Sequence, residues 1–360
     1  MSDNLFDRLF ELFQSPGPVN WKLAREVMHS ITGVVQPIEP TVAEEYQELT
    51  LAAQLRLAEA TSLEVSTSRP LHPVDRATWA DENEQSFRYL VEPLVGKLTA
   101  PADNPAIGAM LQPMGPAILG IQAGTTVGFM SHRALGQFDT GLPALDHDDM
   151  LLVVQNVEGF AKDHGVDHRQ IRLWAACHEV THHAIMAVPW LRGHFVDIVG
   201  TFYDTVEFDP SRLMETMTGL QDPEQIEGLV SGPGGISGLL GSTYDESRLA
   251  PIQAFVAIVD GYADYTVRRA AADLLPQLDL IEEANGRRRT EPNDAEQFLQ
   301  QVVGLELHRH RARDAAAFCV EIERRWSDDA LSILWDDPSH LPTVDELTDL
   351  VGWAARTLLD

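Results

Sequence analysis

The residues best suited to catalysis lie in one short stretch, His178-Glu179-Val180-Thr181-His182, which is a complete H-E-x-x-H motif. On a helix, His178 and His182 share one face and can present two imidazole nitrogens to one metal ion. Glu179 then lies beside the first histidine, where its carboxylate can accept a proton from a metal-bound water. The motif therefore predicts a hydrolytic Zn²⁺ site with Glu179 as the general base.

The sequence around the motif predicts a buried helix. Most residues from 171 to 177 and from 184 to 188 are apolar, and Pro189 is expected to end the helix. Two buried histidines and a buried carboxylate need polar partners, which a metal ion would supply. The context therefore favours a metal site over a pair of histidines on an ordinary helix.

A third metal ligand must come from outside the motif. One class of zinc proteases uses a histidine six residues after the second one, but that position holds Val188. The best candidate is Asp260, with Asp264 four residues later on the same face of a predicted helix. Asp264 would accept a hydrogen bond from a ligating histidine and fix its orientation. His183 and His194 are alternative ligands.

The group that stabilises the oxyanion of the reaction is left open by the sequence. Zinc hydrolases commonly take a Tyr, His or Arg from outside the motif for this role. His308 and Tyr262 are the candidates retained here, and Arg309 and Tyr244 compete with them.

Helical periodicity dominates the segments that must position these residues. The segments expected to be helical are residues 21–32, 40–62 and 82–98, followed by closely packed helices in the small, apolar stretch 106–135. Gly286-Arg287-Arg288-Arg289 is expected to form a solvated turn. The helices should therefore provide most of the scaffold.

Strand signals are few. The best candidates are residues 135–139 and 150–156, whereas residues 70–73 are expected to form a linker between helices. An edge strand ahead of the motif could pair with an extended peptide substrate. The expected fold class is mainly α with a small β-sheet (α+β).

Composition limits the possible partners. A chain of 360 residues with 44% hydrophobic residues can bury a sizeable core. The formal net charge of −29 disfavours nucleic acid and anionic membrane surfaces as partners. Two cysteines cannot form a disulfide framework, and neither a membrane span nor an apolar signal segment is evident. A soluble, cytoplasmic protein is expected.

The sequence also resembles the zincin-like metallopeptidase type 2 family, long catalogued as a domain of unknown function and as hydrolases, mainly of actinobacteria. The matching segments, in the family's order, are Leu135-Gly136-Gln137-Phe138-Asp139, Trp174 with the H-E-x-x-H motif, Pro189-Trp190-Leu191-Arg192, Asp260-Gly261-Tyr262-Ala263-Asp264, Gly304-Leu305-Glu306-Leu307 and Leu341-Pro342-Thr343. The family usually has Glu-Gly in the later helix, where Glu is taken as the third ligand. This chain has the shorter Asp260 there.

The resemblance implies a zincin-like metalloprotease core with an additional helical bundle. We divide the chain into an N-terminal helical region at 1–105, the zincin-like core with the metal site at 106–275, and a C-terminal helical region at 276–360. The expected function is a zinc-dependent hydrolase acting on a peptide or a small amide. The alternatives are a non-peptide amide or ester hydrolase of a biosynthetic pathway and a catalytically inactive zincin-like binding scaffold.

Overall fold

The computed structural model describes residues 17–98, 105–145, 148–207, 245–291 and 309–359. Its longer elements are α2 (Trp21–Thr32), α3 (Pro40–Ala60), β1 (Leu71–Val74), α4 (Arg76–Asn83), α5 (Glu92–Leu98), α6 (Pro105–Arg133), β2 (Met150–Val153), α7 (Val154–His164), α8 (His168–Met186), α9 (Leu191–Asp204), α13 (Ala250–Ala271), α14 (Leu278–Thr290), α16 (Ala312–Trp326), α17 (Asp328–Ser332) and α18 (Leu350–Thr357). Five short 3₁₀ helices complete the described part: η1 (Arg88–Leu90), η2 (Glu246–Arg248), η3 (Arg309–Arg311), η4 (Ile333–Trp335) and η5 (Pro338–His340). The mainly α fold class with a small sheet is confirmed.

The sheet of the described region consists of β1 and β2, which pair in parallel with Leu71 opposite Met150. On its other side β2 meets residues 135–137, because Gln137 N donates to Leu151 O and Val153 N donates to Leu135 O. Residues 135–139 therefore contribute an isolated bridge at Gly136 and not a strand. Because both sides of β2 are taken, the expected pairing of this strand with a peptide is not available in this arrangement.

The elements differ from the sequence expectation at four places. Residues 82–98 form the end of α4, a 3₁₀ turn and α5 and not one helix, and residues 70–73 belong largely to β1 and not to a linker. Val154 begins α7, so the predicted strand 150–156 ends at Val153. The fourth difference concerns residues 286–289, which continue α14 through its last turns and do not form a solvated turn.

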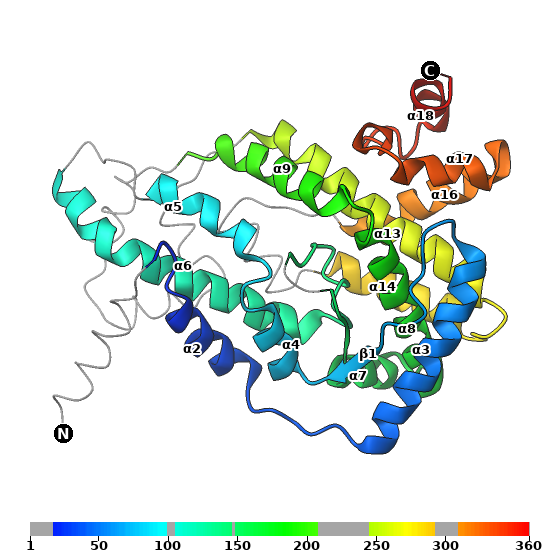
Figure 1. Cartoon of the computed structure of the whole chain (residues 1–360), viewed down its shortest axis with the longest axis horizontal. Coiled ribbons are helices and arrows are strands. Elements are labelled where there is room, and N and C mark those ends of the chain that lie inside the picture. The colour runs from blue at the N-terminus through cyan, green and yellow to red at the C-terminus, as the bar shows by residue number, and fades with distance from the viewer. Residues whose placement is uncertain (1–16, 99–104, 146–147, 208–244, 292–308, 360) are drawn as a thin grey trace.

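Helices α2 and α6 lie side by side, as Figure 1 shows. A stripe of glycines on α6 allows this approach: a Cβ on Gly120 would lie 2.3 Å from Asn20 O, and a Cβ on Gly124 would lie 2.1 Å from Ala24 O. The small, apolar stretch at 106–135 is thus one long helix, and the expected close packing is confirmed.

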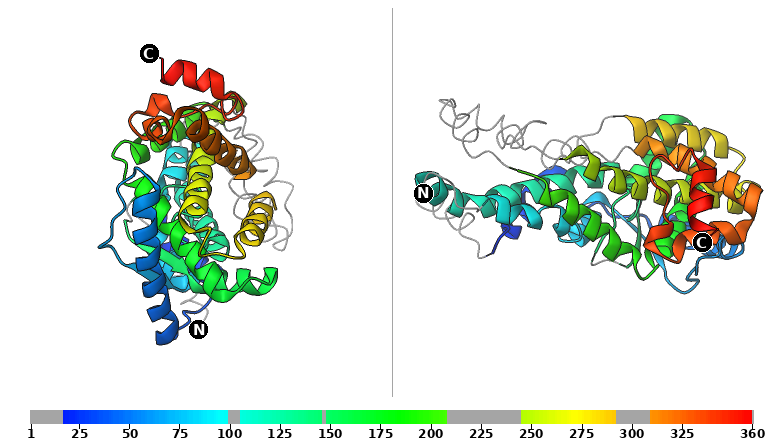
Figure 2. Two further views of the ribbon diagram at one scale, coloured as in Figure 1. Left: turned by 90° about the vertical axis from the view of Figure 1, so that its right-hand side faces the viewer. Right: turned by 90° about the horizontal axis from the view of Figure 1, so that it is seen from above.

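Helix α13 is the central element for the site because its side chains enter both apolar clusters of the core. Phe255 and Val259 pack in the larger cluster, with α6, α9 and α16, whereas Val267 packs in the smaller one with α3 and α8. Figures 1 and 2 show α13 passing through the body of the molecule beside α8. None of the described helices has the length and apolar character needed to cross a membrane.

Candidate metal centre

Helices α8 and α13 position the H-E-x-x-H motif and the two aspartates. Asp167 caps the start of α8 by accepting a hydrogen bond from Gln170 N, and the motif lies two to four turns further along this buried helix. Asp260 and Asp264 lie on one face of α13, as their spacing predicts. Packing between the two helices brings the histidine face of α8 against the aspartate face of α13.

The four side chains stand in two pairs. His182 Nε2 lies 3.3 Å from Asp260 Oδ1, and His178 Nε2 lies 3.3 Å from Asp264 Oδ1. The ring centroids of the two histidines are 5.8 Å apart. Asp260 is fully buried and His182 is almost so. The sequence-predicted ligands and the predicted supporting aspartate are therefore neighbours in space.

The orientation of His182 makes Nδ1 a donor and turns Nε2 towards Asp260. Its Nδ1 lies 2.9 Å from the carbonyl oxygen of His178 and must donate a proton, because a carbonyl oxygen only accepts. In the neutral imidazole, Nε2 then carries a lone pair that faces the carboxylate of Asp260. Two acceptors at this distance need either a second proton on the imidazole or a positive ion between them.

His178 is also suited to ligation. Burial, reinforced by the nearby His182 and Arg289, lowers the pKa of His178 well below its ordinary value, so this imidazole is neutral. The ring packs on Trp174, with 4.0 Å between the ring centroids. Its Nε2 has no well-formed hydrogen bond within the described residues. A neutral imidazole whose Nε2 carries the lone pair is what a metal ion requires of a ligand.

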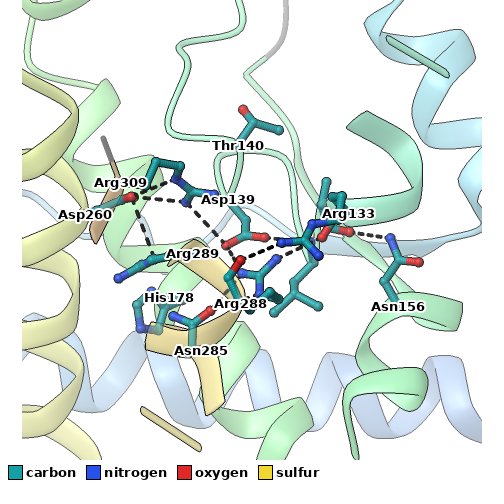
Figure 3. Close-up of polar contacts among 12 residues, drawn as sticks. Arg133, Asp139, Thr140, Asn156, His178, Asp260, Asn285, Arg288, Arg289 and Arg309 are labelled. Carbon is teal, nitrogen blue, oxygen red and sulfur yellow. Dashed lines mark hydrogen bonds and ion pairs between the residues drawn. The ribbon is translucent and has the colours of Figure 1, made fainter. Parts of the chain in front are cut away.

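Two arginines flank the aspartates. Arg309 places Nε and Nη2 3.1 Å from Asp260 Oδ2, and Arg289 donates from Nη1 to Asp264 Oδ2 at 2.5 Å. Burial alone would raise the pKa of Asp260, but Arg309 and Arg289 hold it well below its ordinary value. Burial raises the pKa of Asp264 despite Arg289. Figure 3 shows Arg309 between Asp260 and Asp139, with Arg289 beside His178.

These residues fit zinc in their donor types, since imidazole nitrogen and carboxylate oxygen are both common zinc ligands. The Nε2 of His178 without a well-formed hydrogen bond and the approach of His182 Nε2 to Asp260 Oδ1 support the same conclusion. Their side chains nevertheless stand in pairs, and within the described ranges no three His, Cys, Asp or Glu groups surround a common point at metal distance.

Glu179 faces a different part of the structure. Its carboxylate accepts hydrogen bonds from the backbone N–H groups of Gln137 (3.0 Å), Leu151 (3.3 Å) and Phe138 (3.4 Å). Burial raises the pKa of Glu179 to about 8, although these three donors oppose the shift. Gly136 lies so close that a Cβ there would be 2.2 Å from Glu179 Oε2. The predicted base is thus held by residues 136–138 and β2, away from the histidine–aspartate pairs.

The remaining sequence candidates lie elsewhere. Tyr262 bonds Thr61 Oγ1 at 2.8 Å and packs against Trp335, so it does not face the paired residues. His194 packs between Trp190 and Phe255. His183 borders a separate cavity of about 420 Å³ beside Arg69 and Arg192.

The oxyanion candidates His308 and Tyr244 lie outside the described residues. Of the two described groups considered for this role, Arg309 contacts Asp260 and Tyr262 does not face the aspartates.

Comparison with known proteins settles the family. The family model described as "Zincin-like metallopeptidase" matches residues 19–354. The chain belongs to this zincin-like family. Its fold is similar to the crystal structure of a "putative hydrolase with a novel fold" from Chloroflexus aurantiacus, with a TM-score of 0.65 and 21% identity over 94% of this chain and 98% of that one. No curated protein matches the chain. Family membership places the protein among hydrolases in general terms.

Sequence reasoning missed Arg288 and Arg289 of this zincin-like chain. The run Arg287-Arg288-Arg289 follows Gly286 and was expected to be solvated, yet helix α14 carries Arg289 into the site and Arg288 to Asp139 at 2.7 Å. The signal that could have found them is helical spacing, because Arg289 lies four and eight residues after Asn285 and Ile281, which are also buried.

A cavity of about 710 Å³ adjoins the zincin-like site. Asp264, Arg289 and Arg309 lie on its wall and on the edge of the histidine–aspartate cluster. The cavity is bordered by α13, α14, η3 and the start of α16. Its size is that of a small-molecule site and not that of a long peptide cleft.

Proposed function

We propose that this protein is a zinc-dependent hydrolase that cleaves amide bonds, with His178, His182 and Asp260 as metal ligands. The observation that carries the proposal is His182 Nε2 facing Asp260 Oδ1 at 3.3 Å while Nδ1 of the same ring faces the His178 carbonyl, beside the buried Nε2 of His178, which makes no well-formed hydrogen bond within the described residues. Membership of the zincin-like family supports it. A bound zinc ion would lower the pKa of a water molecule towards about 7 and polarise the substrate carbonyl.

The chain's own residues hold the donors in a defined state. The carbonyl of His178 fixes the tautomer of His182, and Arg309 holds Asp260 through Oδ2, which leaves Oδ1 directed at the imidazole. Asp264, held by Arg289, faces Nε2 of His178, which is the nitrogen that the metal would take, so it would have to turn aside or bind the ion itself. Partners of this kind orient ligands and raise metal affinity.

Glu179 is the proposed general base, in keeping with its position in the motif. In the described arrangement its carboxylate accepts three backbone N–H bonds, from Gln137, Phe138 and Leu151. The proposed role therefore requires these bonds to break during the reaction, so that the carboxylate can turn towards the substrate. Residues 136–138 would then change position with it.

A short peptide or a small amide suits the site better than a long peptide. The adjoining cavity measures about 710 Å³, and both sides of β2 are already paired. Amide and ester hydrolysis of a small biosynthetic intermediate is the alternative within the same chemistry.

A catalytically inactive scaffold is the second candidate. It is favoured by the three N–H bonds that hold Glu179 and by the two arginines that already balance the charges of Asp260 and Asp264. A structural zinc site would need no base.

Metal content and turnover test the proposal together. We would measure zinc by elemental mass spectrometry in tag-free protein, in Asp260→Ala, and in Asp273→Ala as a matched control, because the Asp273 carboxylate is exposed and pairs with Arg56. The expected result is about one zinc ion per chain in the parent and control, and a loss in Asp260→Ala. A parent chain without zinc after zinc is offered would overturn the metal assignment.

Measurements of turnover distinguish the proposed enzyme from a catalytically inactive scaffold. We would screen the parent, Glu179→Gln and the control Asp273→Ala, whose exposed carboxylate lies outside the 710 Å³ cavity, against libraries of short peptides and small amides. Glu179→Gln is expected to keep zinc and lose at least about 100-fold in turnover, the usual scale of general-base catalysis. Turnover that is unchanged in Glu179→Gln would exclude Glu179 as the base, and a parent that binds zinc but cleaves nothing would favour the scaffold.

A further inference from the structure

Arg289 occupies an unusual position at the end of the 710 Å³ cavity. Its side chain is 4% exposed, yet it borders this cavity together with Asp264 and Arg309. Helix α14 places it there, two residues beyond the exposed Arg287.

One edge of the Arg289 guanidinium is not used by the protein. Nη1 donates to Asp264 Oδ2, whereas Nε and Nη2 have no hydrogen-bond partner within the described part of the chain. The nearest acid to Nε is Asp260, whose Oδ2 lies 3.8 Å away and is already bound by Arg309. Buried guanidinium donors are normally satisfied, so this edge calls for an acceptor from a ligand.

The acids around the cavity are largely engaged by other cations. Arg268 pairs with Asp279 and Glu282, and Arg287 pairs with Glu283 at 3.5 Å. Asp260 and Asp264 are balanced by Arg309 and Arg289. An anionic group that enters the cavity therefore meets compensated acids and an incompletely bonded guanidinium, although the whole chain is strongly acidic.

We propose that the cavity binds its substrate through a carboxylate group, which accepts hydrogen bonds from Nε and Nη2 of Arg289. The planar edge of a guanidinium matches the two oxygens of a carboxylate. The amide nature of the substrate rests on the proposed function. The substrate is then a small amide or short peptide that bears an acid group. Arg289 is then the residue that determines specificity, and it would hold the substrate beside the histidine–aspartate cluster.

Binding of matched ligands tests this inference without requiring activity. We would titrate full-length protein, treated with a chelating resin, with N-acetyl-alanyl-alanine and with its C-terminal amide by calorimetry. Removing metal first ensures that a carboxylate cannot bind through zinc. The acid is expected to bind at least about ten-fold more tightly than the amide. Equal affinities in the parent protein would overturn the proposal.

Variants of Arg289 test whether this residue causes the preference for the acid over the amide. Arg289→Gln is expected to abolish the preference for the acid, whereas Arg325→Gln, an exposed arginine on α16 that pairs with Glu321, keeps it. Arg289→Lys retains a charge for Asp264 but loses the planar edge, so an intermediate preference is expected, and this variant serves if Arg289→Gln does not fold. A full preference in folded Arg289→Gln or Arg289→Lys would overturn the proposal. Absence of zinc or of turnover would instead bear on the proposed function alone.

Discussion

At the scale of single residues, the contact between Gly136 and Glu179 shows how the H-E-x-x-H glutamate is held. The backbone of residues 136–138 must approach the carboxylate closely enough to donate hydrogen bonds, and a side chain at 136 would block it. A Cβ there would lie 2.2 Å from Glu179 Oε2 and 3.0 Å from Leu151 O. The glycine therefore belongs to the machinery that positions Glu179.

Gly136→Ala is consequently expected to destabilise the protein by roughly 1–3 kcal/mol, the usual cost of overpacking. Gly159→Ala on α7 is the matched control, because nothing lies within 4 Å of its added Cβ. This control should be neutral or slightly stabilising. Urea unfolding monitored by circular dichroism measures both, and equal stabilities would contradict the packing argument.

The same residue scale shows how far the sequence alone could reach. Helical spacing correctly placed His178 with His182 and Asp260 with Asp264, because four-residue periodicity is a local property. It could not show that Glu179 turns towards residues 136–138, since that depends on a segment more than 40 residues away.

Arg289 was missed for a related reason. Its partner Asp264 lies 25 residues earlier in the chain, and the basic run around it predicts solvation when it is considered alone. The family resemblance supplied the zincin-like identity, which a five-residue motif could only suggest.

At the scale of elements, the α2–α6 pair depends on the absence of side chains along one stripe of α6. Gly124 faces the backbone of Ala24, with 2.1 Å from a built Cβ to the carbonyl oxygen. Backbone atoms cannot swing away as a flexible side chain would, so any Cβ must push the two helices apart.

Gly124→Ala should therefore cost about 1–3 kcal/mol of unfolding free energy, although alanine is the better helix former. Gly200→Ala on α9, where nothing lies within 4 Å of the added Cβ, should be neutral or gain up to about 1 kcal/mol. Chemical denaturation of the two variants provides the comparison. If Gly124→Ala were as stable as the parent, helix separation would not be the constraint that the glycine relieves.

At the scale of the whole molecule, ion pairs connect the expected core to the expected C-terminal region. Asp139, which follows α6, lies 2.7 Å from Arg288 on α14 and 3.9 Å from Arg309 in η3. Arg309 and Arg289 in turn reach Asp260 and Asp264 on α13. The division of the chain at residue 276 stays a prediction, but these contacts indicate that its last part stabilises the site.

This network makes a prediction about acid stability. Burial alone would raise the pKa of Asp139, but Arg288, Arg309 and the N–H of Leu135 hold it below its ordinary value. A carboxyl group with a lowered folded-state pKa contributes stability above its unfolded pKa of about 4, and this contribution is lost as the pH falls through the folded-state pKa. Asp139→Asn should therefore be less stable than the parent by roughly 1–3 kcal/mol at pH 7, the usual cost of leaving buried donors without their acceptor.

The difference in unfolding free energy between parent and Asp139→Asn should narrow as the pH falls below about 4, because the carboxyl group of the unfolded parent then takes up a proton that the folded state, with its lowered pKa, does not. Urea unfolding of the parent and Asp139→Asn at several pH values from 3 to 7 measures this difference in stability. Asp279→Ala, which removes a 91% exposed carboxylate paired with Arg268, should cost less than about 1 kcal/mol throughout. A stability difference between parent and Asp139→Asn that widened towards acid pH would mean that the folded protein holds the Asp139 carboxyl group in its protonated form. Arg309 and Arg289 would then balance the charges of Asp260 and Asp264 alone.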